Sequence, residues 1–145
     1  MQDRFKFRAV LHQNKYEEYR LEKFSHQRVF DVMSINLGIE HSTIEIIAEY
    51  PNGDWAVREI DDKDIDLMQC TGLKDKNDKL IYEGDIVKIF HVSGTMQGKY
   101  FFDVVEWNDL RRRFDTKNYG IIDDDDVYEV IGNIYENPEL LEVNK

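Results

Sequence analysis

Cysteine and long apolar segments are both scarce in this chain of 145 residues. Cys70 is the single cysteine, so no disulfide can form within the chain, which excludes a small secreted domain held by disulfides and fits a reducing compartment. The apolar runs are only a few residues long, whereas a helix that spans a bilayer needs roughly 20. The stretch from Met1 to Arg8 also lacks the apolar centre of a signal peptide. These absences predict a cytoplasmic protein that does not cross a membrane.

Positive charge is scarce as well, since 19 lysines and arginines face 30 aspartates and glutamates and leave a net charge of -11. Nonspecific binding to nucleic acid requires Lys and Arg side chains that displace counterions from phosphates, and binding to an anionic membrane surface has the same requirement. The carboxylate excess therefore disfavours nucleic acid and membranes as partners. It favours solubility and leaves a basic protein as a suitable partner.

The sequence also lacks the patterns that mark an active site or a metal site. The aspartate run Asp123–Asp126 has neither the glycine nor the closing glutamate of an EF-hand loop, and we interpret it as a solvated acidic loop. Cys70 is interpreted as a buried structural residue. None of the four histidines has a metal-binding spacing; they are His12, His26, His41 and His91. We therefore expect no cofactor, no metal and no catalytic residue, and predict that the protein is not an enzyme.

The apolar residues that are present recur mostly with a period of two, which is typical of β-strands with one buried face. From Thr43 to Tyr50, two isoleucines and an alanine alternate with threonine, glutamates and one further isoleucine, Ile47. Asn52-Gly53 separates this run from a second one at residues 55–60, and Asn-Gly between two alternating runs predicts a hairpin. Residues 16–24 fit either a helix or an irregular strand.

The second half of the chain shows the same pattern at close spacing. Runs rich in Val, Ile and aromatic residues occupy residues 86–90, 100–107 and 127–135, and short strands so close together predict a small closed barrel. Gly132 lies inside the last run and indicates a bulge or a sharp corner. Asn137-Pro138-Glu139 has the composition of a helix start and predicts a short C-terminal helical turn.

The predicted fold class is therefore mainly β, in two parts. Residues 1–64 would form an N-terminal β segment with at most a short helix. Residues 65–145 would form the small barrel and the C-terminal turn. The acidic stretch at residues 61–66 is the best candidate for the boundary.

Several stretches of the chain together resemble the YopX family of phage and prophage proteins. They read KFRA at residues 6–9, TGLKDKN at 71–77, IYEGDIVK at 81–88 and VIGNIYENPELL at 130–141. The resemblance implies a mainly β architecture whose second half is an SH3-like barrel, in a protein that acts inside a bacterial host cell. It implies no catalytic residues, because the family has no established activity.

Arg111, Arg112 and Arg113 lie between Trp107 and Phe114 and form the strongest local candidate for a binding site. Arginines among aromatic side chains can grip a phosphate or stack on a base. The favoured interpretation is an exposed hairpin tip whose charges offset the nearby aspartates.

Three functional hypotheses follow. The favoured one is a non-enzymatic phage or prophage accessory protein that binds another protein, such as one encoded by the host, or that forms a homo-oligomer. The second is a nucleic-acid-associated protein that uses the Arg111–Arg113 loop. The third is an acidic decoy that occupies a basic site on a host protein.

Overall fold

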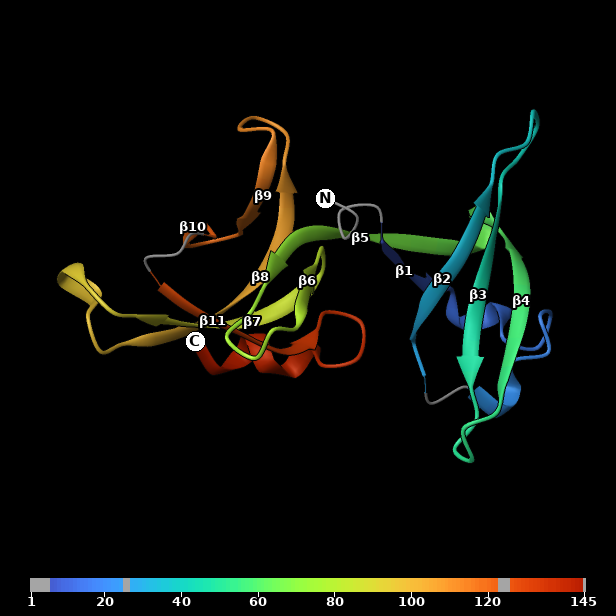
Figure 1. Ribbon diagram of the computed structural model, residues 1–145, viewed down its shortest axis with the longest axis horizontal. Helices are drawn as coiled ribbons and strands as arrows, with labels where there is room; N and C mark the ends of the chain where they lie inside the picture. Colours follow the sequence, from blue (N-terminus) through green and yellow to red (C-terminus); the bar gives the residue numbers. More distant parts are fainter. Residues whose placement is uncertain (1–5, 25–26, 123–125, 145) are drawn as a thin grey trace. The chain divides into compact units, whose positions relative to one another are not determined.

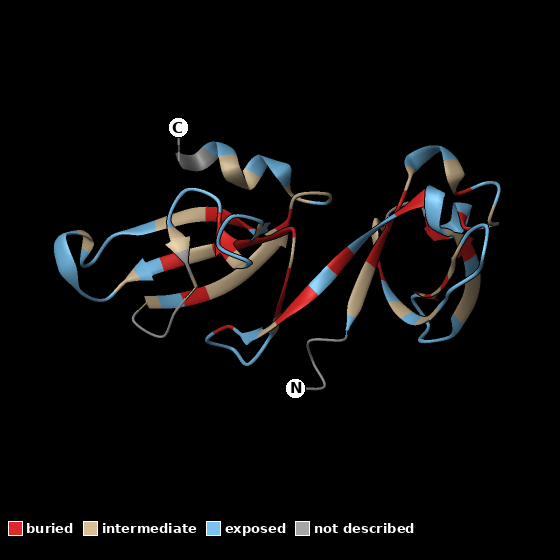
Figure 2. Ribbon diagram, turned by 90° about the horizontal axis from the view of Figure 1, so that it is seen from above, coloured by how far each residue is buried: buried red, intermediate tan, exposed pale blue. Residues whose placement is uncertain are grey.

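The computed structural model describes residues 6–24, 27–122 and 126–144 of the chain. It consists of antiparallel strands and short 3-10 helices, so the mainly β prediction is confirmed (Figure 1). The chain divides into two compact units, an N-terminal unit of Lys6–Met68 and a C-terminal unit that begins at Gln69. Buried stretches occur in both units, so each has a core of its own (Figure 2).

The N-terminal unit is a sheet in the order β4-β3-β2-β1-β5. Its strands are β1 (Phe7–Leu11), β2 (Val29–Asn36), β3 (Thr43–Glu49), β4 (Trp55–Asp61) and the first part of β5 (Ile65–Lys74). Residues 16–24, which the sequence left open between helix and strand, contain the 3-10 helix η3 (Glu22–Phe24). Another 3-10 helix, η2 (Gln13–Lys15), precedes them, and η4 (Asp62–Asp64) joins β4 to β5.

The core of this unit lies on one face of the sheet. Alternation in β3 sends one set of side chains inward, where they meet residues of β1, β2, β4 and the segment around η2 and η3. The buried members of this core are Ala9, Leu11, Tyr16, Leu21, Phe24, Phe30, Ile44, Ile46, Ala48, Ile60 and Ile65. The other face of the β2-β3-β4 meander stays open to solvent over part of its length, and it becomes important below.

The hairpin predicted from Asn52-Gly53 joins β3 to β4. The Tyr50 backbone N–H donates to the Asp54 carbonyl oxygen at 2.6 Å, and the Asn52 side-chain oxygen accepts from the Asp54 N–H at 3.0 Å. Gly53 takes a φ of 88°, a conformation that glycine adopts without steric cost. The turn therefore fixes the register of the two strands.

The C-terminal unit has a sheet in the order β10-β9-β8-β7-β11. Its strands are β7 (Asp85–His91), β8 (Tyr100–Asn108), β9 (Arg113–Thr116), β10 (Gly120–Ile121) and β11 (Asp126–Asn133), and the second part of β5 pairs with β6 (Leu80–Tyr82). The 3-10 helix η5 (Gly94–Met96) lies in the β7–β8 connection. One buried apolar cluster of this unit consists of Ile81, Val87, Ile89, Val105 and Tyr128, and Ile86 is also fully buried.

The predicted closed barrel is not found among the described residues, because the five-stranded sheet is open. A polar loop, rather than a strand, covers part of the free edge of β11. The Lys76 N–H donates to the Tyr128 carbonyl oxygen at 2.9 Å, and the Val130 N–H donates to Asp75 Oδ2 at 2.8 Å. These contacts use hydrogen-bonding groups that a further strand would need in order to close the sheet.

Gly132 marks the bulge that the sequence indicated. The pairing of β11 with β7 shifts register between Val130 and Gly132. A Cβ atom on Gly132 would lie 2.5 Å from the Asn137 side-chain oxygen, so only glycine leaves room for that side chain. The C-terminal turn is the 3-10 helix η6 (Pro138–Asn144), which follows Asn137 as predicted.

Candidate functional site

The outer face of the β2-β3-β4 meander carries an apolar surface. Partners across an antiparallel pair project from the same face of the sheet. The register pairs Ile47 with Val57 on one side and with Asp31 on the other, and it pairs Glu49 with Trp55. Because the neighbouring residues of β3 point into the core, these five residues face away from it.

Met33 joins this surface through a β-bulge. Val32 pairs with Ile46 and Ser34 pairs with Glu45, so Met33 is an extra residue in β2 without a partner in β3. A bulge of this kind redirects a side chain and bends the strand. The side chain of Met33 lies beside Ile47 as a result.

Four residues line a hollow of about 290 Å³ on this face, namely Met33, Ile47, Glu49 and Trp55. We call it the outer-face hollow. Met33 is 59% exposed and Trp55 is 65% exposed, although burial of large apolar side chains is favourable by about 25 cal/mol per Å². Exposed Trp and Met gathered in one hollow are typical of a protein-binding surface.

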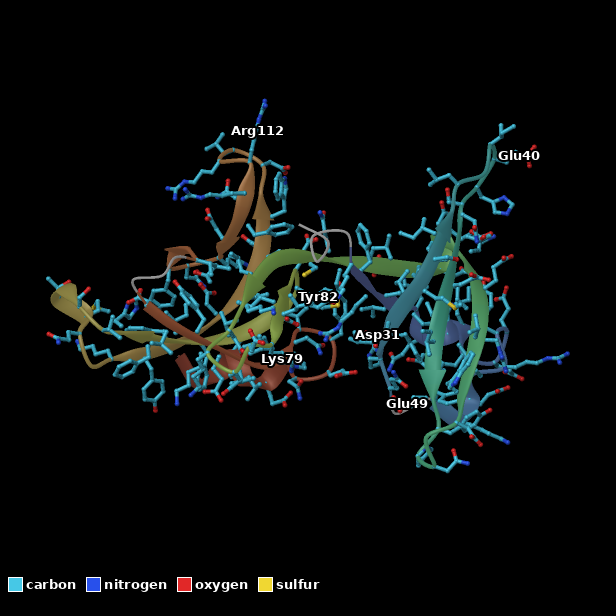
Figure 3. The ribbon with its side chains drawn as sticks, in the orientation of Figure 1. Asp31, Glu40, Glu49, Lys79, Tyr82 and Arg112 are labelled. Atoms are coloured by element: carbon cyan, nitrogen blue, oxygen red, sulfur yellow. The ribbon has the colours of Figure 1, made fainter. Side chains whose placement is uncertain are left out.

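The surroundings of the hollow are acidic. The strand register places four carboxylates on the same outer face as Ile47, namely Asp31, Glu45, Glu49 and Glu59, and Arg58 is the one Lys or Arg between Val29 and Asp61. Arg58 is used within the unit, since its Nε donates to the Tyr19 carbonyl oxygen at 3.2 Å. Figure 3 shows Asp31 and Glu49 on this meander; Arg8 lies 3.7 Å from Asp31 and offsets part of that charge. The hollow therefore suits an apolar side chain that is accompanied by positive charge.

Sequence reasoning did not identify this hollow. One signal was available, because Ile47 is an isoleucine within the polar set of β3 and so had to face solvent or a partner. The bulge at Met33 has no comparable signature in the sequence. The sequence could therefore indicate a surface site at Ile47, but it could not predict which other residues line that site.

The four residues predicted as a binding site lie in the β8–β9 hairpin. Trp107 pairs with Phe114 across the strands, and their ring centroids are 5.1 Å apart at 73°. Arg113 Nε donates to Asp115 Oδ1 at 2.7 Å, so the charge of this arginine is largely balanced. Two of the three arginines, Arg111 and Arg113, therefore approach one carboxylate, that of Asp115.

Arg111 and Arg112 lie at the tip of this hairpin. Arg111 Nη1 is 4.0 Å from Asp115 Oδ2, at the limit of an ion pair, and its backbone N–H donates to the Asn108 side-chain oxygen at 2.9 Å. Arg112 has a φ of 53°, and its side chain points away from the hairpin (Figure 3). Leu110 beside them is 94% exposed. The tip therefore presents an apolar side chain together with two arginines.

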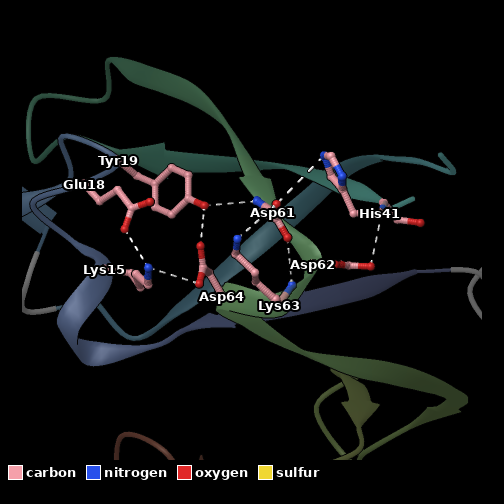
Figure 4. A network of polar contacts seen from close by, with 9 residues as sticks. Lys15, Glu18, Tyr19, His41, Asp61, Asp62, Lys63 and Asp64 are labelled. Atoms are coloured by element: carbon pink, nitrogen blue, oxygen red, sulfur yellow. Dashed lines mark hydrogen bonds and ion pairs between the residues drawn. The ribbon is translucent and has the colours of Figure 1, made fainter. Parts of the chain in front are cut away.

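A polar network ties the segment around η2 to η4, which precedes β5 (Figure 4). The Tyr19 hydroxyl donates to Asp64 Oδ2 at 2.6 Å, and Lys15 Nζ lies 3.3 Å from Asp64 Oδ1. The hydrogen bond from Tyr19, followed by the contact with Lys15, lowers the pKa of Asp64 against the opposing effect of burial. Burial and then Asp64 raise the pKa of Tyr19. The network holds all of its members in place, so we regard it as structural.

The remaining candidate residues do not assemble a reaction centre or a metal centre within residues 6–24, 27–122 and 126–144. No group of three His, Cys, Asp or Glu side chains in these ranges is arranged to hold a metal ion. Cys70 is buried, as predicted. His91 Nδ1 lies 2.9 Å from Asp126 Oδ2. His26 and most of the aspartate run lie outside the described residues.

The fold and the hollow define a mainly β protein of two antiparallel units with an exposed apolar surface. None of its described helices has the length and apolar character needed to cross a membrane. The chain belongs to the YopX family, whose family model, described as YopX protein, matches residues 6–142. The resemblance seen in the sequence is thereby confirmed.

A solved structure, that of protein EF1440 from Enterococcus faecalis, is similar to this chain. The two share 27% sequence identity and a TM-score of 0.56, and the match covers 94% of this chain and 96% of EF1440. None of the curated proteins matches the sequence. The similarity supports the fold, and the name of EF1440 carries no activity over to this chain.

Proposed function

We propose that this YopX-family chain is a non-enzymatic protein-binding module whose contact surface is the outer-face hollow. The observation that carries the proposal is the exposure of Met33 and Trp55 around one apolar hollow with an acidic surround. Binding would remove both side chains from water, while the carboxylates would select a partner with Lys or Arg beside its apolar side chain. The protein would act as a phage or prophage accessory factor in the bacterial cytoplasm.

The proposal can be tested with short synthetic peptides of defined composition. One peptide carries a central leucine between arginines, a second has alanine in place of that leucine, and a third has glutamates in place of the arginines. The readout is the fluorescence of Trp55 in a Trp107→Phe background, which leaves one tryptophan in the chain. We expect saturable binding of the first peptide and at least tenfold weaker binding of the other two.

A matched control separates the hollow from exposed aromatic residues in general. Tyr100 in β8 is 54% exposed, an exposed fraction similar to that of Trp55, but it belongs to the C-terminal unit. Calorimetric titration should show that Trp55→Ala abolishes binding of the leucine peptide and that Tyr100→Ala leaves it unchanged. Equal binding of all three peptides, or equal loss in both variants, would contradict the proposed site.

A further inference from the structure

The chain itself carries a segment with the chemistry that the outer-face hollow requires. The β8–β9 hairpin projects from its sheet (Figure 1), and its tip presents Leu110 at 94% exposure with Arg111 and Arg112 directly after it. Asp109 precedes the leucine, but the two arginines outnumber it. Arg113 takes no part, because its Nε lies 2.7 Å from Asp115 Oδ1. Arg111 is farther from this carboxylate, at 4.0 Å, so only part of its charge is offset.

We propose that the partner of the hollow is a second copy of this chain, which inserts Leu110 and places Arg111 and Arg112 against the acidic surround. This inference rests on the proposed function of the hollow. The hairpin tip is narrow and exposed, and the hollow of about 290 Å³ can hold a leucine side chain. Glu49, which lines the hollow, supplies a carboxylate for one of the arginines.

The geometry of such a contact decides what kind of assembly forms. The hairpin of one copy meets the hollow of the next, so the two surfaces are different. A chain of copies therefore keeps one free hairpin at one end and one free hollow at the other. Contacts of this heterologous type produce closed rings or open chains rather than symmetric dimers. A hairpin tip covers little area, so each contact should have a Kd of roughly 10–100 μM, as for small interfaces.

Two complementary variants test the contact by sedimentation velocity. The hairpin variant is Leu110→Ala with Arg112→Glu, and the hollow variant is Met33→Ala with Trp55→Ala; all four side chains are exposed, so both proteins should keep the circular dichroism spectrum of the parent chain. We expect the parent chain to assemble beyond a dimer as its concentration rises through the Kd range, and each variant alone to stay at the monomer mass of 17.3 kDa.

The mixture of the two variants is the decisive sample. The hairpin variant keeps its hollow and the hollow variant keeps its hairpin, so together they can form one contact and no more. We expect a heterodimer of twice the monomer mass that does not grow further. Only contact between two different chains can produce this result, which excludes a hairpin that folds back onto the hollow of its own chain.

A control variant and a peptide competitor complete the design. Leu37→Ala with Lys99→Glu removes a similarly exposed leucine, which is 87% exposed, and reverses the charge at one lysine. This variant should assemble like the parent chain. The arginine–leucine peptide that binds the hollow should also dissociate the assemblies of the parent chain.

The outcomes distinguish this inference from the proposed function. A parent chain that remains monomeric, or a mixture without heterodimer, overturns self-assembly even when the peptide binds the hollow and the proposed function stands. Assembly that the hollow variant retains overturns self-assembly through the hollow. If the peptide also fails to bind, both proposals fall.

Discussion

Replacing Asp75 by asparagine tests what holds the free edge of β11 in place. Asp75 Oδ1 accepts hydrogen bonds from the backbone N–H groups of Asn77 and Lys79, both at 2.9 Å, and its Oδ2 accepts from the Val130 N–H at 2.8 Å. Asparagine has one side-chain carbonyl oxygen. Either the N–H groups of Asn77 and Lys79 or that of Val130 would then face the amide NH₂ group, which cannot accept a hydrogen bond. Asp75 is buried, and water cannot easily replace the lost acceptor.

The expected loss of unfolding free energy is about 2–4 kcal/mol. A hydrogen bond to a charged group contributes about 1.5–3 kcal/mol, and a buried donor left without a partner adds a similar penalty, which local relaxation reduces. The control is Asp78→Asn in the same loop, where the Asp78 side chain is 83% exposed and lies 3.4 Å from Lys74 Nζ. An exposed ion pair of this kind contributes about 0–1 kcal/mol.

The effect of Asp75 should depend on pH in one direction. Burial opposes ionisation of Asp75, but the hydrogen bonds from Val130, Lys79 and Asn77 together outweigh it and lower its pKa. A lowered pKa in the folded state stabilises the protein above the unfolded-state pKa of about 3.9, and this contribution is lost as the pH falls through the folded-state value. The gap between the parent protein and Asp75→Asn should therefore be constant near neutral pH and shrink below about pH 4.

The assay is urea unfolding followed by the fluorescence of Trp107, which lies in the same unit as Asp75. A Trp55→Phe background removes the tryptophan of the N-terminal unit. The reasoning is refuted if Asp75→Asn costs no more than Asp78→Asn at neutral pH. A gap that stays constant down to pH 2.5 would refute the proposed role of the ionised carboxylate.

Three further predictions concern the core, the polar network and nucleic acid. Ile86→Ala should cost about 2–4 kcal/mol in urea unfolding, because Ile86 is fully buried, and a loss below about 0.5 kcal/mol would contradict its place in the core. Tyr19→Phe should raise the pKa of Asp64, whose largest stabilising contact is with the Tyr19 hydroxyl; carbon-13 NMR titration of the carboxyl group measures the change, and an unchanged pKa would disprove the assignment. DNA should bind more weakly than about 10⁻⁵ M at 150 mM salt in fluorescence anisotropy, because Asp115 balances Arg113. Tighter binding that is lost on replacing all three hairpin arginines by alanine would favour the nucleic-acid hypothesis instead.

The strands and turns could be predicted from the sequence because their causes are local. Alternation between inward and outward residues needs only a period of two, and the hairpin at Asn52-Gly53 needs only residues that tolerate positive φ. The bulge at Gly132 followed from a glycine inside a strand pattern. The YopX resemblance also came from contiguous stretches of residues.

Barrel closure could not be predicted in the same way, because it depends on what meets the edge of a strand. The prediction of a closed barrel counted strands at close spacing, and the strands are indeed there. The edge of β11 is instead met by the loop around Asp75 and Lys76, fifty and more residues earlier in the chain. The spacing of the strands does not predict this contact between the loop and the edge of β11.

The two surfaces in our proposals show the same division. The sequence by itself determined the acidic charge of the β2-β3-β4 region, the outward position of Ile47 and the arginines beside Leu110. Only the tertiary structure decided that the bulge brings Met33 beside Ile47 and Trp55. It also decided that Asp115 pairs more closely with Arg113, at 2.7 Å, than with Arg111, at 4.0 Å, so that the hairpin tip presents Leu110, Arg111 and Arg112. The physical reason is that composition and alternation act residue by residue along the chain, whereas exposure and pairing arise from register between strands.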